Sequence, residues 1–340
     1  MNILSGMSLA EIEELVLSLN ASKFRAKQIH NWVYLKSVAT IDEMTDLSKQ
    51  FREEFKEVAT VTKSKIKLKQ VSSDGTIKYL IEYPDGECVE TVLMRFDNRA
   101  NLTACVSSQV GCAVNCSFCA TGQRGFIRNL TYQEIVEQVL TIQRDTGLKV
   151  TNIVFMGQGE PLLNLDNVLK ALEIFNNDFQ IGARRITIST SGIVPQIKKL
   201  AALELQSTLA ISLHASNHAV REKIMPIEKK YPINELMNAL KEYVDKTGRR
   251  ITVEYILIKD LNCTLESAKE LAHLLQNIKC NINLIPYNPV TKTDYQKPSN
   301  NEIMKFKYLL EHSGKKVTVR LERGADIDAA CGQLSGKAVK

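Results

Sequence analysis

The feature that most limits the possible folds is a repeated alternation of short apolar runs and longer amphipathic stretches in the second half of the chain. Short runs rich in branched side chains are typical of buried strands, and the stretches between them have helical periodicity. Repetition of strand, helix and strand predicts a parallel sheet. About six units, rather than eight, favour an α/β fold with a partial (β/α)6 barrel and an open mouth. The runs are NIVFM, RITIS, TLAISL, ITVEYILI, INLIPY and KVTVRL.

Polar side chains follow several of these runs. They occur in GQGEP at 157–161, in STSG at 189–192, in SLH at 212–214 and in YNP at 287–289. A single Ser or Asn after a strand is usually a turn residue or a helix cap. Because the carboxyl ends of parallel strands meet at one rim, where barrel enzymes have their active sites, the shared position favours a common site.

Three cysteines stand close together in the segment CAVNCSFC: Cys112, Cys116 and Cys119. Four-iron clusters usually take four cysteine ligands, so this trio predicts a 4Fe-4S cluster with one iron open to a small molecule. An open iron indicates chemistry rather than electron storage alone. Gly111 and Asn115 suit a tight loop, since both residue types tolerate left-handed backbone conformations.

Zinc is the competing metal for part of this set. Cys116 and Cys119 together with His214 and His218 reproduce the pair spacings of zinc ligands. The two pairs lie much further apart in the sequence than those of a zinc finger. The iron cluster is therefore the favoured interpretation, and the zinc site stays as an alternative.

The chain of 340 residues is long enough for about two domains. A capping box at Ser8 and Glu11 precedes an amphipathic stripe, and residues 1–60 are predicted to form a small helical module for binding or positioning. Turn sequences at 74–75 and 84–86 predict a β meander over 61–97. The remaining predicted parts are a catalytic core at 98–326 and a tail at 327–340.

The composition permits a polyanionic partner without requiring one, because the net charge is +6. Lys63, Lys65, Lys67 and Lys69 recur at every second position, which on a strand predicts one basic face, either solvated or bound to RNA. The acidic N-terminus lacks an export signal, and no apolar run reaches the roughly 18 residues of a membrane span. These features predict a cytoplasmic protein with free or metal-bound thiols and no membrane partner.

Taken together, the cysteine trio and the GQGEP segment resemble the radical S-adenosylmethionine (SAM) enzymes over roughly residues 98–326. The resemblance implies that the trio binds a 4Fe-4S cluster and that SAM occupies the open iron. Carboxylate, hydroxyl and amide groups suit the methionyl ammonium, the ribose and the adenine of SAM. By resemblance, the SAM site contains Gly159, Glu160, Ser189, Ser212, Leu213, His214 and Asn288.

Two further segments, CVSSQVGC with Cys105 and RGADIDAACGQL with Cys331, resemble the dual-specificity RNA adenine C2 methyltransferases. The resemblance implies that Cys331 carries the methyl group and that Cys105 forms a transient disulfide with it, with two SAM molecules consumed per turnover. It also implies that Glu90, in ECVETVLM, accepts the C2 proton. Taken singly, each thiol would be an inert buried residue and Glu90 a solvated strand carboxylate.

The implied substrates are adenine 2503 of 23S rRNA and adenosine 37 of tRNAs, with flavodoxin or flavodoxin reductase as electron donor and a monomeric enzyme. Adenine C2 is electron-poor, which explains why a radical route would be needed. A related class that methylates adenine C8 remains an alternative, and so does a metal-containing RNA-binding regulator without turnover. An ordinary one-step methyltransferase is disfavoured because no glycine-rich nucleotide loop follows an early strand.

Overall fold

The computed structural model describes residues 1–96, 99–290 and 293–336. The predicted boundary at 97–98 and the last four residues of the predicted tail lie outside this part. The strands are β1 (Asn2–Ile3), β2 (Ala59–Thr60), β3 (Lys65–Val71), β4 (Ile77–Glu82), β5 (Cys88–Phe96), β6 (Arg99–Cys105), β7 (Gln109–Gly111), β8 (Phe126–Asn129), β9 (Asn152–Phe155), β10 (Ile186–Thr190), β11 (Thr208–Ser212), β12 (Ile251–Leu257), β13 (Cys280–Pro286) and β14 (Lys316–Val319).

The helices frame these strands. The α-helices are α1 (Leu9–Ser18), α2 (Lys23–Tyr34), α3 (Lys49–Val58), α4 (Ala120–Arg124), α5 (Tyr132–Thr146), α6 (Leu165–Asn177), α7 (Val194–Ala202), α8 (His218–Ile224), α9 (Ile233–Thr247), α10 (Leu265–Leu275) and α11 (Asn300–His312). The 3-10 turns are η1 (Ile41–Glu43), η2 (Pro161–Asn164), η3 (Ala183–Arg185), η4 (Pro226–Lys229) and η5 (Ala325–Ile327).

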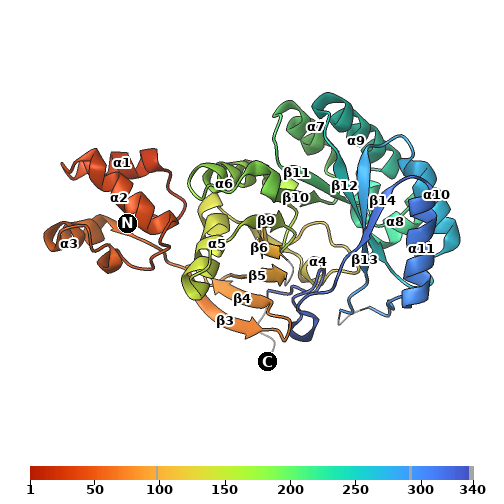
Figure 1. Ribbon diagram of the computed structural model, residues 1–340, viewed down its shortest axis with the longest axis horizontal. Coiled ribbons are helices and arrows are strands. Elements are labelled where there is room, and N and C mark those ends of the chain that lie inside the picture. The colour runs from red at the N-terminus through yellow and green to blue at the C-terminus, as the bar shows by residue number, and fades with distance from the viewer. Residues whose placement is uncertain (97–98, 291–292, 337–340) are drawn as a thin grey trace.

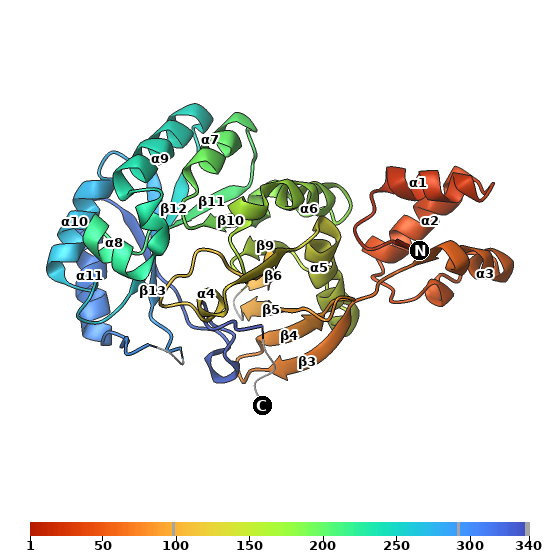
Figure 2. The same ribbon diagram turned by 180° about the vertical axis from the view of Figure 1, so that it is seen from behind.

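One ten-stranded sheet forms the body of the molecule, in the order β14-β13-β12-β11-β10-β9-β6-β5-β4-β3. Strands β6 and β9 to β14 pair in parallel, whereas β3 to β6 pair in antiparallel fashion. The sheet curves, and α5, α6, α7, α9, α10 and α11 cover its outer face (Figures 1 and 2). The predicted α/β fold with a partial (β/α)6 barrel is confirmed.

All six predicted apolar runs correspond to strands, β9 to β14. The first parallel strand of the barrel, β6, was not predicted from the sequence. Its side chains Asn101, Thr103 and Cys105 face the interior of the barrel, so the inward face of β6 is polar. Strands β3 to β5, the predicted meander, extend the same sheet rather than forming a separate layer.

Helices α1 to α3 form a small unit at one end of the molecule, beside α5 and α6 (Figures 1 and 2). The capping box of Ser8 and Glu11 starts α1 as predicted. Partly buried polar contacts join this unit, and the segment that follows it, to the barrel. Ser64 and Thr62 donate to Glu137 of α5 at 2.9 and 2.6 Å, and a His30 ring nitrogen lies 2.6 Å from an Asp178 carboxylate oxygen.

No helix in the described ranges combines the length and the apolar character that a membrane crossing requires.

Candidate active site

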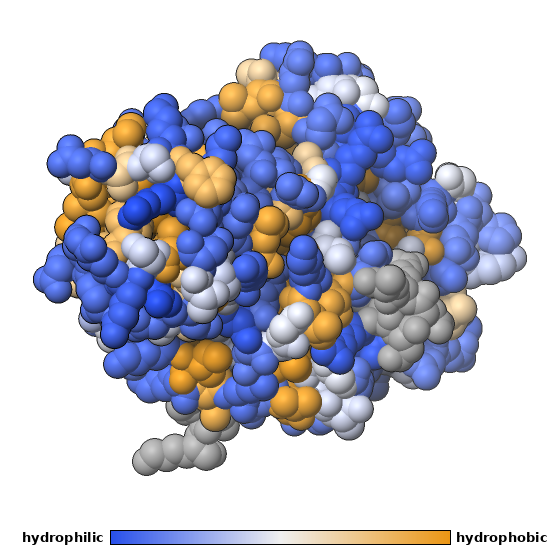
Figure 3. Space-filling model, turned by 60° about the vertical axis from the view of Figure 1, so that its left-hand side comes forward, coloured by the Kyte–Doolittle hydropathy of each residue, from blue (hydrophilic) through white to orange (hydrophobic). Residues whose placement is uncertain are grey.

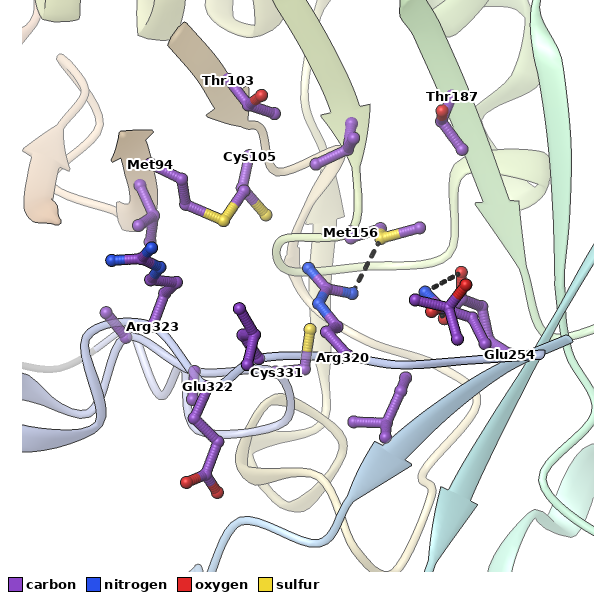
Figure 4. Close-up of a pocket in the computed structure, with 18 of the residues that line it drawn as sticks. Met94, Thr103, Cys105, Met156, Thr187, Glu254, Arg320, Glu322, Arg323 and Cys331 are labelled. Atoms are coloured by element: carbon purple, nitrogen blue, oxygen red, sulfur yellow. Dashed lines mark hydrogen bonds between the residues drawn. The ribbon is translucent and has the colours of Figure 1, made fainter. Parts of the chain in front are cut away.

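A cavity of about 660 Å³ lies inside the curved sheet. Figure 4 shows its walls, with Cys105 and Met156 on one side, Glu254 on the other, and Arg320 and Cys331 entering from the chain that follows β14. The cavity mixes apolar walls with a few charged and thiol groups, as expected for a binding site that orients a reactant.

The two cysteines that the resemblance paired, Cys105 and Cys331, line this one cavity although they are far apart in the sequence. Cys105 ends β6, opposite Val92 of β5, and Cys331 lies in the loop after η5. Both are free thiols. Burial, with a further contribution from nearby Cys331, raises the pKa of Cys105 to about 12. The thiol of Cys105 is therefore protonated at neutral pH in this state.

Arg320 stands beside both thiols, and the sequence analysis did not single it out. Its guanidinium donates to the sulfur of Met156 at 3.5 Å. Neighbouring Cys331 is the main reason that the pKa of Arg320 is raised, and Glu254 and Cys105 add to the effect. A fixed cation at this point favours negative charge on either sulfur.

The loop that carries Cys331 lies against the cysteine trio. Asn288 donates from its side-chain amide to the Cys331 carbonyl at 3.0 Å. The backbone N–H of Ala120 donates to the Gly332 carbonyl at 2.7 Å. The Thr121 hydroxyl donates to the Leu334 carbonyl at 2.6 Å. These contacts fix the Cys331 loop against the start of α4, directly after the third cysteine of the trio.

The RGADID segment that precedes this loop docks on the β3–β4 turn. Ser72 donates from its hydroxyl to Asp326 at 2.5 Å, and the Ser73 N–H donates to the other Asp326 oxygen at 3.1 Å. The Gly324 N–H donates to Asp74 at 3.0 Å, and Gly324 has a φ of +65°. The turn predicted from Asp74-Gly75 is therefore also the docking surface for the start of the tail.

The cysteine trio is held on a tightly folded loop between β7 and α4. Gly111 has a φ of +74°, and a Cβ atom there would lie 1.8 Å from the Gly125 carbonyl oxygen. Asn115 has a φ of +56°, which agrees with its predicted left-handed conformation. Burial raises the pKa of Cys112 to about 12, and burial together with the two neighbouring thiols raises the pKa of Cys116.

This donor set fits an iron-sulfur cluster. Within the described residues, no three His, Cys, Asp or Glu side chains converge as the ligands of a single metal ion do. The three thiolates of a cluster bind three different irons, so they must lie on one loop but need not converge on a single metal position. The trio meets that requirement.

The four residues of the alternative zinc site do not come together in the structure. The Nδ1 atom of His214 accepts a hydrogen bond from the Ile256 N–H at 3.0 Å. His218 places its two ring nitrogens 2.7 and 3.1 Å from Glu228 and Glu222, and its side chain is 56% exposed. The two histidines therefore have other partners, and the four residues do not form one site.

The GQGEP segment joins neighbouring strand ends. Glu160 is buried, and its two carboxylate oxygens accept from the Leu162 N–H at 2.9 Å and from the Ser191 N–H at 2.6 Å. Burial raises its pKa. Gly159 has a φ of +97°, and a Cβ atom there would lie 2.5 Å from the Cβ of Gln109. Only glycine fits at this position.

The other residues predicted for the SAM site lie at the carboxyl rim. Ser189 is near the end of β10, Ser212 ends β11, and buried Leu213 and His214 follow it. Burial, with a smaller effect of Arg221, lowers the pKa of His214 to about 3, so its ring is neutral. Asn288 connects this rim to the tail, since its side-chain amide donates a hydrogen bond to the Cys331 carbonyl.

Arg221 organises this rim, and the sequence analysis did not identify it. Its side chain is fully buried, pairs with equally buried Glu228, and donates to the carbonyls of Ser191 at 2.7 Å and Leu213 at 3.2 Å. These bonds connect the residues that follow β10 and β11. Arg221 therefore fixes two strand ends relative to each other.

Replacement of Arg221 by Met should lower the free energy of unfolding by about 3–5 kcal/mol, because Glu228 would lose its buried cationic partner. Urea unfolding followed by circular dichroism measures the loss. Arg249→Met is the matched control, since Arg249 bonds to Gln206 at the surface. A loss no larger than that of the control would contradict the role assigned to Arg221.

Glu90 is not solvated, in contrast to the default expectation for a strand carboxylate. It is 2% exposed on β5 and forms an ion pair with buried Lys78 of β4 at 3.1 Å. Its second oxygen accepts from the Gly336 N–H in the tail at 2.7 Å. Lys78 was missed because a single lysine in an otherwise apolar strand gives no local indication of its partner.

Comparison with known proteins first defines the class. Residues 106–275 match the model of the Radical SAM superfamily, which is half of the chain. Residues 1–61 match the model of the ribosomal RNA large subunit methyltransferase N-terminal domain. The cysteine trio and the barrel thus belong to a radical SAM enzyme, and the enzyme uses a 4Fe-4S cluster and SAM.

Full-length relatives define the family. A probable dual-specificity RNA methyltransferase RlmN of Alkaliphilus oremlandii is 50% identical, and the match covers 98% of this chain and 97% of the relative. A protein of the same description from Nostoc punctiforme is 45% identical, with 97% and 92% covered. The chain belongs to the RlmN family of RNA methyltransferases.

A solved structure supports the fold over the whole length. The crystal structure of a radical SAM methyltransferase from Sphaerobacter thermophilus has a TM-score of 0.94 and 42% identity, covering 99% of this chain and all of the other. The enzyme is therefore an RNA methyltransferase with a radical SAM core, as the sequence analysis predicted.

Proposed function

We propose that this enzyme methylates C2 of adenine 2503 in 23S rRNA and of adenosine 37 in tRNAs, through a methyl group carried on Cys331. The main support is one arrangement, in which Cys105 and Cys331 line the same cavity beside the loop of the trio. Membership of a family of dual-specificity RNA methyltransferases is consistent with two RNA substrates.

In this proposal the two thiols divide the work. Cys331 receives a methyl group from one SAM molecule and then presents that carbon to C2. Cys105 afterwards attacks the Cys331 sulfur, so that an S–S bond forms while the S–C bond to the product breaks. The electron pair of that bond goes to the product carbon, which takes up a proton and becomes the new methyl group, and an external dithiol then reduces the Cys105–Cys331 disulfide for the next turnover. Because burial keeps Cys105 protonated, it must lose its proton before this attack, and nearby Arg320 supplies positive charge for the thiolate.

Glu90 is the proposed acceptor of the C2 proton. It is buried beside the tail, and its carboxylate forms an ion pair with Lys78. A base protected from water suits proton removal from carbon, because a neighbouring water molecule would otherwise occupy the carboxylate through a hydrogen bond. The Gly336 N–H occupies one of its oxygens in this structure.

The cofactor residues have separate tasks. Cys112, Cys116 and Cys119 hold the cluster, and Gly159, Glu160, Ser189, Ser212, Leu213, His214 and Asn288 bind SAM. When bound, the cluster and SAM supply the radical that activates the methyl carbon on Cys331. The protein residues position the groups, exclude water and move the ring proton.

RNA must enter the open mouth of the barrel, and a base in folded RNA has to be splayed out to reach the cavity. Figure 3 shows one face of the molecule, on which hydrophilic residues predominate and several apolar patches lie between them. The lysine row is less uniform than the sequence suggested. Lys67 and Lys69 pair with Glu82 and Asp145, and Lys63 precedes β3. The proposed RNA contacts are therefore Lys63, Lys65 and the helical module.

Nucleoside mass spectrometry tests the proposal. Enzyme reconstituted without oxygen is incubated with SAM, reductant and unmodified 23S rRNA or tRNA, and the RNA is then digested. We expect 2-methyladenosine at one position and none with Cys331→Ala. 8-Methyladenosine would overturn the C2 assignment, and 2-methyladenosine from only one RNA class would overturn dual specificity.

The cellular setting belongs to the same proposal. An enzyme that acts on ribosomal and transfer RNA is expected in the cytoplasm, as a monomer that receives electrons from flavodoxin or flavodoxin reductase. Reduction of the reconstituted protein by these donors tests the proposed electron source. Its mass in solution tests the monomeric state.

A further inference from the structure

The Cys331 loop is fastened at both of its ends to one buried ion pair. Lys78 donates to the Asp328 carbonyl at 3.1 Å and pairs with a Glu90 oxygen at 3.1 Å. The other Glu90 oxygen accepts from the Gly336 N–H at 2.7 Å. Asp328 and Gly336 bracket Cys331, so a closed ring of contacts runs through the loop and back through the pair.

The register of β4 and β5 explains why these two side chains meet. Lys78 pairs with Val92 and Leu80 pairs with Glu90. Lys78 and Glu90 are therefore diagonal neighbours on the same face of the sheet, within reach of long side chains. Val92 on that face lines the cavity, so the pair stands at the wall from which the tail enters.

Burial makes this arrangement specific. The side chains of Lys78 and Glu90 are 4% and 3% exposed. A buried pair of this kind contributes little net stability compared with apolar residues, and in some proteins such a pair fixes one particular geometry. Here the geometry that it fixes includes a backbone carbonyl and a backbone N–H of the tail.

We propose that Lys78 is a positioning residue of the methyl-transfer reaction, and that the Lys78–Glu90 pair clasps both ends of the Cys331 loop so that its thiol faces Cys105. The inference rests on the proposed role of Cys331 as the methyl carrier. It assigns a function to Lys78 and a second function to Glu90 besides proton removal. Glu90 reaches a ring proton only after the Gly336 contact opens, so the clasp and the base act at different stages.

Hydrogen exchange of the full chain, without SAM or RNA, tests the clasp independently of the chemistry. In Lys78→Met we expect amides of residues 328–336 to exchange roughly ten- to hundredfold faster, which matches the loss of one or two charge-assisted hydrogen bonds. Amides of β12 and β13 should be unchanged. Lys67→Met is the matched control, since Lys67 pairs with Glu82 near the surface.

Two further variants keep the test decisive. Lys78→Met combined with Glu90→Gln leaves no unpaired buried charge, so we expect this variant to fold, and its glutamine oxygen should still accept from the Gly336 N–H. Exchange should then increase at the Asp328 end of the loop and stay slow at the Gly336 end. Lys78→Arg, which retains a cationic donor, should restore slow exchange in the loop.

Two results would overturn the clasp. One is that the loop of Lys78→Met exchanges no faster than the same loop of the Lys67→Met control. The other is that the loop of Lys78→Arg exchanges as fast as that of Lys78→Met. Failure of the proposed function gives a different result. In that case the wild-type enzyme would yield no 2-methyladenosine, whereas the exchange differences would remain.

Discussion

Replacement of Cys119 by Ala should abolish RNA methylation and the release of 5′-deoxyadenosine together, with a parallel loss of bound iron. The trio supplies all the protein ligands that the proposed cluster has, so no spare cysteine remains to replace one of them. The backbone contacts of the loop survive this change, because Ala120 holds the Gly332 carbonyl through its own N–H. The tail should therefore remain docked while the cluster is lost.

Iron analysis and quantification of both products measure this effect in protein reconstituted without oxygen. Cys263→Ala is the matched control, since Cys263 is a partly buried free thiol that packs against the hydrophobic core, away from the cavity. Methylation retained by the Cys119 variant at the level of the control would refute the cluster assignment.

The second large effect concerns Cys105. In the proposed mechanism the methyl carbon on Cys331 becomes a methylene bridge to the RNA, and Cys105 resolves it. In Cys105→Ala no thiol would resolve this bridge, so a covalent protein–RNA adduct should accumulate towards one equivalent while turnover stops. Val92, Met94 and Leu334 pack around the lost sulfur, and a small cavity there should not unfold the protein.

Denaturing gel electrophoresis and mass spectrometry of nuclease-treated protein detect the adduct on Cys331. The double variant Cys105→Ala/Cys331→Ala should form none. Free RNA and unmodified enzyme in the single variant would contradict the two-thiol scheme, since they would place the block before the new carbon bond.

Local patterns predicted much of the fold. Strands β9 to β14 were found because their runs are apolar and bounded by helical stretches. Strand β6 was missed because its sequence, RANLTAC, contains few apolar side chains: Asn101 and Thr103 face the cavity, and Leu102 and Ala104 alternate with them. The strands that were found also place polar residues toward the cavity, but branched apolar side chains fill their other positions.

The residues of the site were likewise predicted only in part. The trio is visible in sequence because its ligands share one loop. Arg320, Lys78 and Arg221 were not predicted, because their roles depend on which strands are neighbours and on how the tail returns to the sheet. The partner of a buried cation cannot be identified from a single apolar run, since it is set by strand register.

The return of the tail to the β3–β4 turn also has a consequence for the order of folding. The Ser72–Asp326 contact joins residues separated by 254 positions. A contact between residues so far apart closes a large loop, and its entropic cost is not offset until the sheet between the two segments has formed. The Cys331 loop is therefore expected to dock late in folding, after the strands against which it packs have paired.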